Sequence, residues 1–123
     1  MKKFLAVVAL ILWSGAAAAQ HNHGDTKGPN GGAMQDVAGV HAELVVSGNT
    51  VTINLFDEAN KPVPAKGFSG SLLLVSGNSR ETIQLAPSGD SALKGEAKNA
   101  VATGAQVTLV LKNTAGKSGQ AKF

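Results

Sequence analysis

Residues 40–57, VHAELVVSGNTVTINLFD, decide the fold. Two runs of strand-forming residues flank the turn sequence SGN. In the second run every other residue is apolar (Val51, Ile53 and Leu55), which is the period of a strand with one buried face. This stretch therefore predicts an antiparallel β-hairpin that turns one face toward a core.

The rest of the chain repeats this pattern of short apolar stretches separated by Gly, Asn and Pro turns. Further strands are expected over residues 69–76, 80–86, 92–97 and 106–112, with a short edge strand over 33–37 and a last strand that ends at Phe123. The run LLLV at residues 72–75 is apolar on both faces, which is typical of a central strand. No helical period reaches three turns.

Six or seven strands at this spacing predict an all-β fold, a small antiparallel β-sandwich of immunoglobulin-like size, with a small barrel as the alternative. The alternating apolar positions are assigned to the core. They are Val51, Ile53, Leu55, Leu74, Ile83, Val107, Leu109 and Leu111.

The N-terminal residues have the pattern of an export signal. Lys2 and Lys3 precede ten apolar residues (4–13) and a run of small residues that ends at Ala19. Residues 1–19 are therefore expected to be a cleaved signal peptide, and the mature protein to be periplasmic or secreted. The apolar run is shorter than the roughly 20 residues of a spanning helix, so no membrane span is expected after cleavage.

Residues 20–32, QHNHGDTKGPNGG, are polar and rich in glycine. They are expected to form a flexible, His-containing arm, followed by the β-sandwich domain over residues 33–123.

Composition excludes several classes of function. The absence of cysteine rules out disulfides and thiolate metal sites. Without residues 1–19 the chain keeps nine Lys and Arg against eight Asp and Glu, a charge near +1, and only three aromatic residues, so nucleic acid is not an expected partner. The chain lacks a G-x-S-x-G motif and places most of its carboxylates in expected turns, so no enzyme and no organic cofactor are predicted.

The histidines are the candidate metal ligands. His21 and His23 lie in the arm with Asp25 just beyond them, and Met34 lies between the arm and His41. Imidazole suits copper, zinc and nickel, and a thioether favours Cu(I). The alternative is a solvated arm whose histidines bind nothing.

His41 and Glu43 are spaced i, i+2 on an expected strand, so both project from one face, with Ala42, Leu44 and Val46 on the core side. An outward His41 and Glu43 could complete a metal site together with the arm. The alternative interpretation is a solvent-facing polar stripe.

The opening of the chain also resembles a known group of proteins. His23-Gly24, then GPNGG at residues 28–32 and VHAELVV at residues 40–46, are similar to small exported bacterial proteins with an "HG…GPNGG…HxELV" opening. Similar segments occur in periplasmic parts of heavy-metal efflux systems, near the adaptor subunits of resistance-nodulation-division pumps. The resemblance implies a periplasmic β-domain that handles copper, zinc or a related cation, with an efflux-system or other envelope protein as partner.

The sequence thus predicts a non-enzymatic, periplasmic metal-binding β-domain that holds a copper or zinc ion. The ligands expected first are His21, His23 and His41, and next Met34, Glu43 and Asp25. The rival prediction is a structural or protein-interaction β-module of the cell envelope that binds no metal and uses a sheet edge or the strand at residues 69–76 to dock a partner.

Overall fold

The computed structural model describes residues 26–123, and the regular elements of this part are all β-strands. The eight strands are β1 (Ala33–Val37), β2 (Val40–Ser47), β3 (Thr50–Phe56), β4 (Ser69–Ser76), β5 (Ser79–Pro87), β6 (Ala92–Glu96), β7 (Gln106–Lys112) and β8 (Ser118–Lys122). Among these residues no helix is long and apolar enough to cross a membrane.

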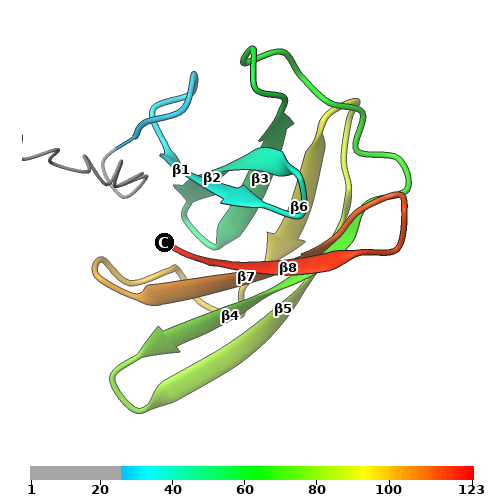
Figure 1. Cartoon of the computed structure of the whole chain (residues 1–123). Coiled ribbons are helices and arrows are strands. Elements are labelled where there is room, and N and C mark those ends of the chain that lie inside the picture. Colours follow the sequence, from blue (N-terminus) through cyan, green and yellow to red (C-terminus); the bar gives the residue numbers. More distant parts are fainter. Residues whose placement is uncertain (1–25) are drawn as a thin grey trace, which may run out of the picture.

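The strands form one antiparallel sheet in the order β1-β2-β3-β6-β5-β4-β7-β8. The sheet folds over on itself, so that β1, β2, β3 and β6 make one wall and β5, β4, β7 and β8 the other (Figure 1). The walls are joined where the end of β5 pairs with β6, at Ala86↔Lys94 and Pro87↔Leu93. β4 lies between β5 and β7, which confirms the central strand expected from its apolar run.

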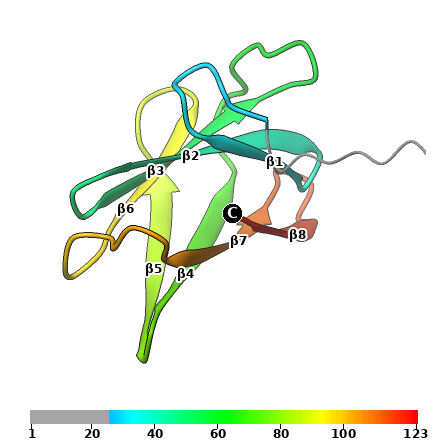
Figure 2. The same cartoon turned by 90° about the vertical axis from the view of Figure 1, so that its left-hand side faces the viewer.

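The two outer strands of the sheet, β1 and β8, meet along a seam (Figure 2). The Nδ2 amide of Asn113 donates to the carbonyl oxygen of Ala38 at 3.2 Å. A Cβ on Gly119 would lie 2.9 Å from the backbone nitrogen of Ala38, so the two edges are in direct backbone contact. The sheet is thus nearly closed.

The core lies between the two walls and is made of alternating inward residues from every strand. All eight apolar residues assigned to it from their alternation are buried. The antiparallel all-β prediction is therefore confirmed. The strand number is eight rather than six or seven, and the two walls belong to one continuous sheet because the nine-residue β5 is long enough to pair with both β4 and β6.

The N-terminal residues differ in part from what the sequence predicts. The expected signal peptide, and with it His21, His23 and Asp25, lies outside the described residues. Residues 26–32, expected to belong to a flexible arm, are instead hydrogen-bonded to the sheet: the amide of Met34 donates to the carbonyl of Thr26 at 3.0 Å, and Lys27 forms a β-bridge with Ala33.

Candidate functional site

Residues 26–34 form a small hairpin whose turn is the sequence PNG. The amide of Gly31 donates to the carbonyl of Gly28 at 2.9 Å, and the amide of Gly28 donates to the carbonyl of Gly32 at 2.7 Å. Gly31 has a φ of 81°, a left-handed conformation that suits glycine. A type I turn with proline at its second position, followed by a left-handed glycine, is a common three-residue hairpin loop. The loop is therefore specified by its own sequence.

This loop closes over the side chain of Glu43. On β2, Ala42 points into the core, so Glu43 points to the outer face of the wall, between Met34 of β1 and Asn54 of β3 in register. Glu43 is nevertheless 0% exposed. Its cover is the loop at residues 28–32, in which the hydrogen-bond donors Asn30 and Gly32 lie 13 and 11 positions earlier in the chain.

Both oxygens of the Glu43 carboxylate accept two hydrogen bonds. Oε2 accepts from the backbone amides of Asn30 at 2.8 Å and Gly32 at 3.0 Å. Oε1 accepts from the side-chain amides of Asn30 at 2.8 Å and Asn54 at 3.3 Å. Hydrogen bonds to an ionised acceptor are among the strongest in proteins, so this set holds the loop firmly on the sheet. We call the loop at residues 28–32 with Glu43 and Asn54 the Glu43 clasp.

Two glycines of the clasp are required by close approach. A Cβ on Gly28 would lie 2.4 Å from the carboxyl carbon of Glu43, and one on Gly32 would lie 2.1 Å from the carbonyl oxygen of Leu44. Neither position has room for a side chain while the loop is closed. The loop GPNGG and the glutamate of HxELV therefore contact each other directly.

The clasp corrects the expectation that Glu43 is exposed to solvent. The strand period gave the correct face, but the acceptor positions of the carboxylate are taken by donors of the protein itself. The core side of β2 is also shorter than expected. Ala42 is fully buried and Leu44 packs partly against the core, whereas Val46 is 40% exposed near the end of the strand.

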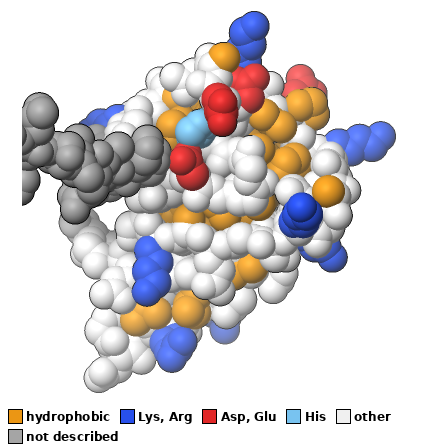
Figure 3. Space-filling model, in the orientation of Figure 1, with side chains coloured by type: hydrophobic (Ala, Val, Ile, Leu, Met, Phe, Trp, Pro, Cys, Tyr) orange, Lys and Arg blue, Asp and Glu red, His pale blue; other side chains and the backbone are white. Residues whose placement is uncertain are grey.

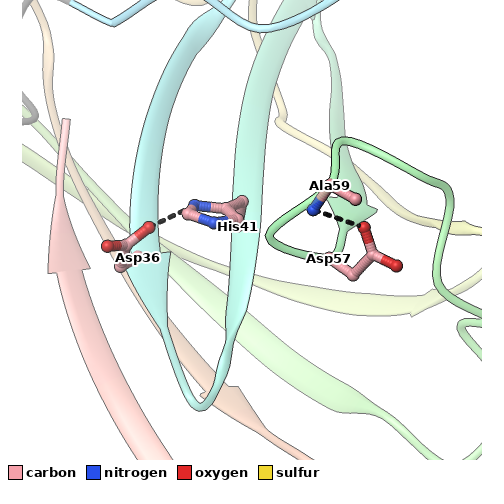
Figure 4. Close-up of polar contacts among 4 residues, drawn as sticks. All are labelled: Asp36, His41, Asp57 and Ala59. Carbon is pink, nitrogen blue, oxygen red and sulfur yellow. Dashed lines mark hydrogen bonds and ion pairs between the residues drawn. The ribbon is translucent and has the colours of Figure 1, made fainter.

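His41 lies on the same outer face, two residues from Glu43, and is in contact with Asp36. Val37 and Val40 flank the two-residue turn Ala38-Gly39, both of whose residues have positive φ, so β1 and β2 form a tight hairpin that sets Asp36 opposite His41. Nδ1 of His41 is in polar contact with Oδ1 of Asp36 (Figure 4). The His41 side chain is 25% exposed and that of Asp36 48%.

A shallow depression of about 150 Å³ lies beside this pair, lined by Asp36, Gly39, Val40, His41 and Glu58. The space-filling view shows acidic side chains on either side of the histidine (Figure 3). Glu58 belongs to the turn after β3, which is fixed by Asp57: its Oδ1 accepts the amides of Ala59 and Lys61, both at 2.9 Å (Figure 4). The depression thus combines one imidazole with carboxylates at a solvent-accessible position.

Of the six residues expected as ligands, the structure brings three together on the outer face of β1 and β2. His41 is accessible, Glu43 is enclosed in the clasp, and Met34 is buried beside it at 5% exposure. His21, His23 and Asp25 lie outside residues 26–123. Within that range no cluster of three or more His, Asp or Glu side chains is arranged to hold a metal ion.

Two residues of this surface were missed from the sequence. Asp36 could have been found from the Ala38-Gly39 turn, since a two-residue hairpin loop pairs residue 36 with residue 41. Asn30 could have been found from the turn sequence PNG, which predicts a hairpin loop rather than an unstructured arm. The contact between Asn30 and Glu43 is not indicated by the residues around either position.

No family model matches this chain, and neither a curated protein nor a solved structure is significantly similar to it.

Proposed function

We propose that this protein is an exported, non-enzymatic metal-binding domain that holds a copper or zinc ion at His41, together with histidines of the N-terminal arm. The observation that carries this proposal is the Asp36–His41 pair at the edge of an acidic, accessible depression. Imidazole is a favoured ligand of both metals, and negative charge around it attracts a cation.

The Asp36 contact orients His41 for this role. Metal-binding histidines commonly give one ring nitrogen to a carboxylate and the other to the metal, because the carboxylate fixes the ring and raises its basicity. Here Asp36 engages Nδ1, and within residues 26–123 no hydrogen bond is formed to Nε2. In this proposal Nε2 is the ligand atom and Asp36 is the residue that positions it.

The described part of the chain supports a contribution from the arm. Thr26 is hydrogen-bonded to Met34, and Asp36 lies two residues further along β1, a distance of about 7 Å. His23 precedes Thr26 by three residues, which span up to about 10 Å when extended. The arm is thus long enough for His23 or His21 to share an ion with His41. Glu43 is not a ligand in this proposal.

Calorimetric titration of the chain beginning at Gln20 with Cu(II), Cu(I), Zn(II) and Ni(II) tests the proposal. Replacing His41 by Gln should weaken binding at least about tenfold, and Asp36→Asn by about 10–100-fold, as for other carboxylates behind a metal-bound histidine. The variant with His21 and His23 both replaced should lose most of the affinity. Binding should also weaken with acid, because the imidazoles must be deprotonated.

The control variant is Glu96→Gln. Glu96 is an exposed carboxylate at the opposite end of β3 from the His41 partner Phe56, so its loss changes the net charge equally without touching the site. A site shared by arm and strand also stabilises the folded protein, by about 2.7 kcal/mol when the free ion is at 100 times Kd, whereas a site confined to an unstructured arm does not. If none of the four ions binds saturably at neutral pH, the protein is instead an envelope interaction module.

A further inference from the structure

The tip of the Glu43 clasp carries the only Asn-Gly step in the sequence, Asn30-Gly31. Both residues are exposed, and no atom lies within 4 Å of the position that a Cβ on Gly31 would occupy. A glycine after asparagine leaves its own backbone nitrogen unscreened, which makes this dipeptide the one most prone to cyclisation. We propose that Asn30 is a site of spontaneous deamidation, and that its conversion to aspartate opens the clasp irreversibly.

The reaction needs only water. The backbone nitrogen of Gly31 attacks Cγ of Asn30, the new C–N bond closes a succinimide ring, and the Cγ–Nδ2 bond breaks. The Nδ2 group leaves as ammonia, taking up the proton lost from the Gly31 amide. Water then opens the ring to give aspartate or isoaspartate, and no atom is oxidised or reduced.

The closed clasp restrains both reacting groups. The nucleophile is engaged, because the Gly31 amide donates to the carbonyl of Gly28 at 2.9 Å. The leaving group is also held, because Nδ2 of Asn30 donates to Oε1 of Glu43 at 2.8 Å. Release of the loop from Glu43 frees the leaving group and allows the turn to rearrange, so the rate of the reaction follows the fraction of open clasps.

The product cannot restore the contact. Aspartate at position 30 places a carboxylate where an amide donor stood 2.8 Å from Oε1, so an attraction becomes a repulsion between two negative groups. Glu43 is fully buried in the closed form, which makes an uncompensated second charge especially unfavourable there. Isoaspartate adds a further atom to the backbone of a turn that is closed by two backbone hydrogen bonds. After deamidation, the loop at residues 28–32 therefore no longer closes over Glu43. This inference does not depend on metal binding.

The first experiment follows deamidation by peptide mass mapping of the folded chain beginning at Gln20, during incubation at mildly alkaline pH. Glu43→Gln should accelerate the reaction at Asn30 at least about tenfold, because the loop loses charge-assisted bonds that hold it closed. Gly31→Ala is the matched control: no atom lies within 4 Å of the added Cβ, which screens the attacking nitrogen, so Asn30 should react more slowly than in the wild type. Asn78, which is exposed in the β4–β5 turn, is the internal reference, and its deamidation rate should be the same in all three proteins.

The second experiment tests the consequence. In Asn30→Asp, hydrogen exchange of the Gly32 amide, which donates to Glu43 in the wild type, should become at least about tenfold faster. Asn78→Asp should leave it unchanged. Equal deamidation rates at Asn30 in the wild type and Glu43→Gln, or an Asn30→Asp protein with a protected Gly32 amide, would each overturn the proposal.

Discussion

Replacing Glu43 by glutamine should lower the free energy of unfolding by about 2–3 kcal/mol, although the two side chains are nearly identical in shape. The carboxylate accepts two donors on each oxygen. Glutamine offers one oxygen, so it satisfies either the backbone amides of Asn30 and Gly32 or the side-chain amides of Asn30 and Asn54. Its NH₂ group then faces the other two N–H donors and cannot accept a hydrogen bond from them.

The magnitude follows from the bonds lost and from what the loop can do in response. Each hydrogen bond to a charged acceptor contributes about 1.5–3 kcal/mol, so two such bonds set an upper limit of about 3–6 kcal/mol. The loop at residues 28–32 lies at the surface, with Asn30 exposed, and can leave the sheet so that its amides are solvated again. The loss is therefore limited to the free energy that holds the loop closed, which brings the expected value below this upper limit, to about 2–3 kcal/mol.

Urea unfolding followed by far-UV circular dichroism measures this change, since Trp13 is the only tryptophan, it lies in the expected signal peptide, and the chain has no tyrosine. The midpoint of thermal unfolding should fall by roughly 8–20 °C for a domain of this size. Asn54→Ala removes only the longest of the four bonds and should cost about 1 kcal/mol. Glu58→Gln, an exposed acid in a turn, should stay within about 0.5 kcal/mol of the wild type. An equally small effect of Glu43→Gln would refute the clasp.

Three further predictions concern packing and maturation. Gly28→Ala should destabilise the protein by about 1–3 kcal/mol, because its Cβ would lie 2.4 Å from the Glu43 carboxyl carbon, whereas Gly31→Asn should cost about 1 kcal/mol or less; a reversed order in chemical denaturation would contradict the close approach. Leu109→Ala should cost about 2–5 kcal/mol and Thr108→Ala under about 1 kcal/mol, since only Leu109 is fully buried. Mass spectrometry of the exported protein should show a chain beginning at Gln20, and recovery of the intact N-terminus would exclude the expected cleavage.

The sequence predicted the strands well because alternation is a local property. β2, β4 and β7 have the expected bounds, and the eight apolar residues assigned to the core by alternation are all buried there. Alternation also gave the correct face for Glu43, but it carries no information about what covers that face. The cover is a loop whose contact with Glu43 depends on how β1 folds back along β2. The continuity of the sheet was not predictable for a similar reason, since it rests on two residue pairs between β5 and β6.

The Asp36–His41 pair is a second contact that strand alternation does not predict. Residues 33–37 were expected as an edge strand, and His41 as an outward side chain, and the structure has both. Their contact requires that Ala38 and Gly39 form a turn with two left-handed residues, a conformation that alanine rarely adopts. The Ala-Gly step gives a weaker hairpin signal than Asn-Gly, so the sequence indicates the partner of His41 only weakly.

The seam between β1 and β8 has a consequence for the order in which the molecule assembles. It joins the first and last strands, and its hydrogen bond between Asn113 and Ala38 spans 75 positions of the chain. Contacts between such distant positions carry the largest loop-closure entropy, so we expect the seam to form after the folding transition state, once the hairpins β2–β3 and β4–β5 are in place. A substitution that disturbs it, such as Gly119→Ala, should then leave the refolding rate nearly unchanged and accelerate unfolding. The closing of the sheet would thus determine how long the native state lasts rather than how quickly it is reached.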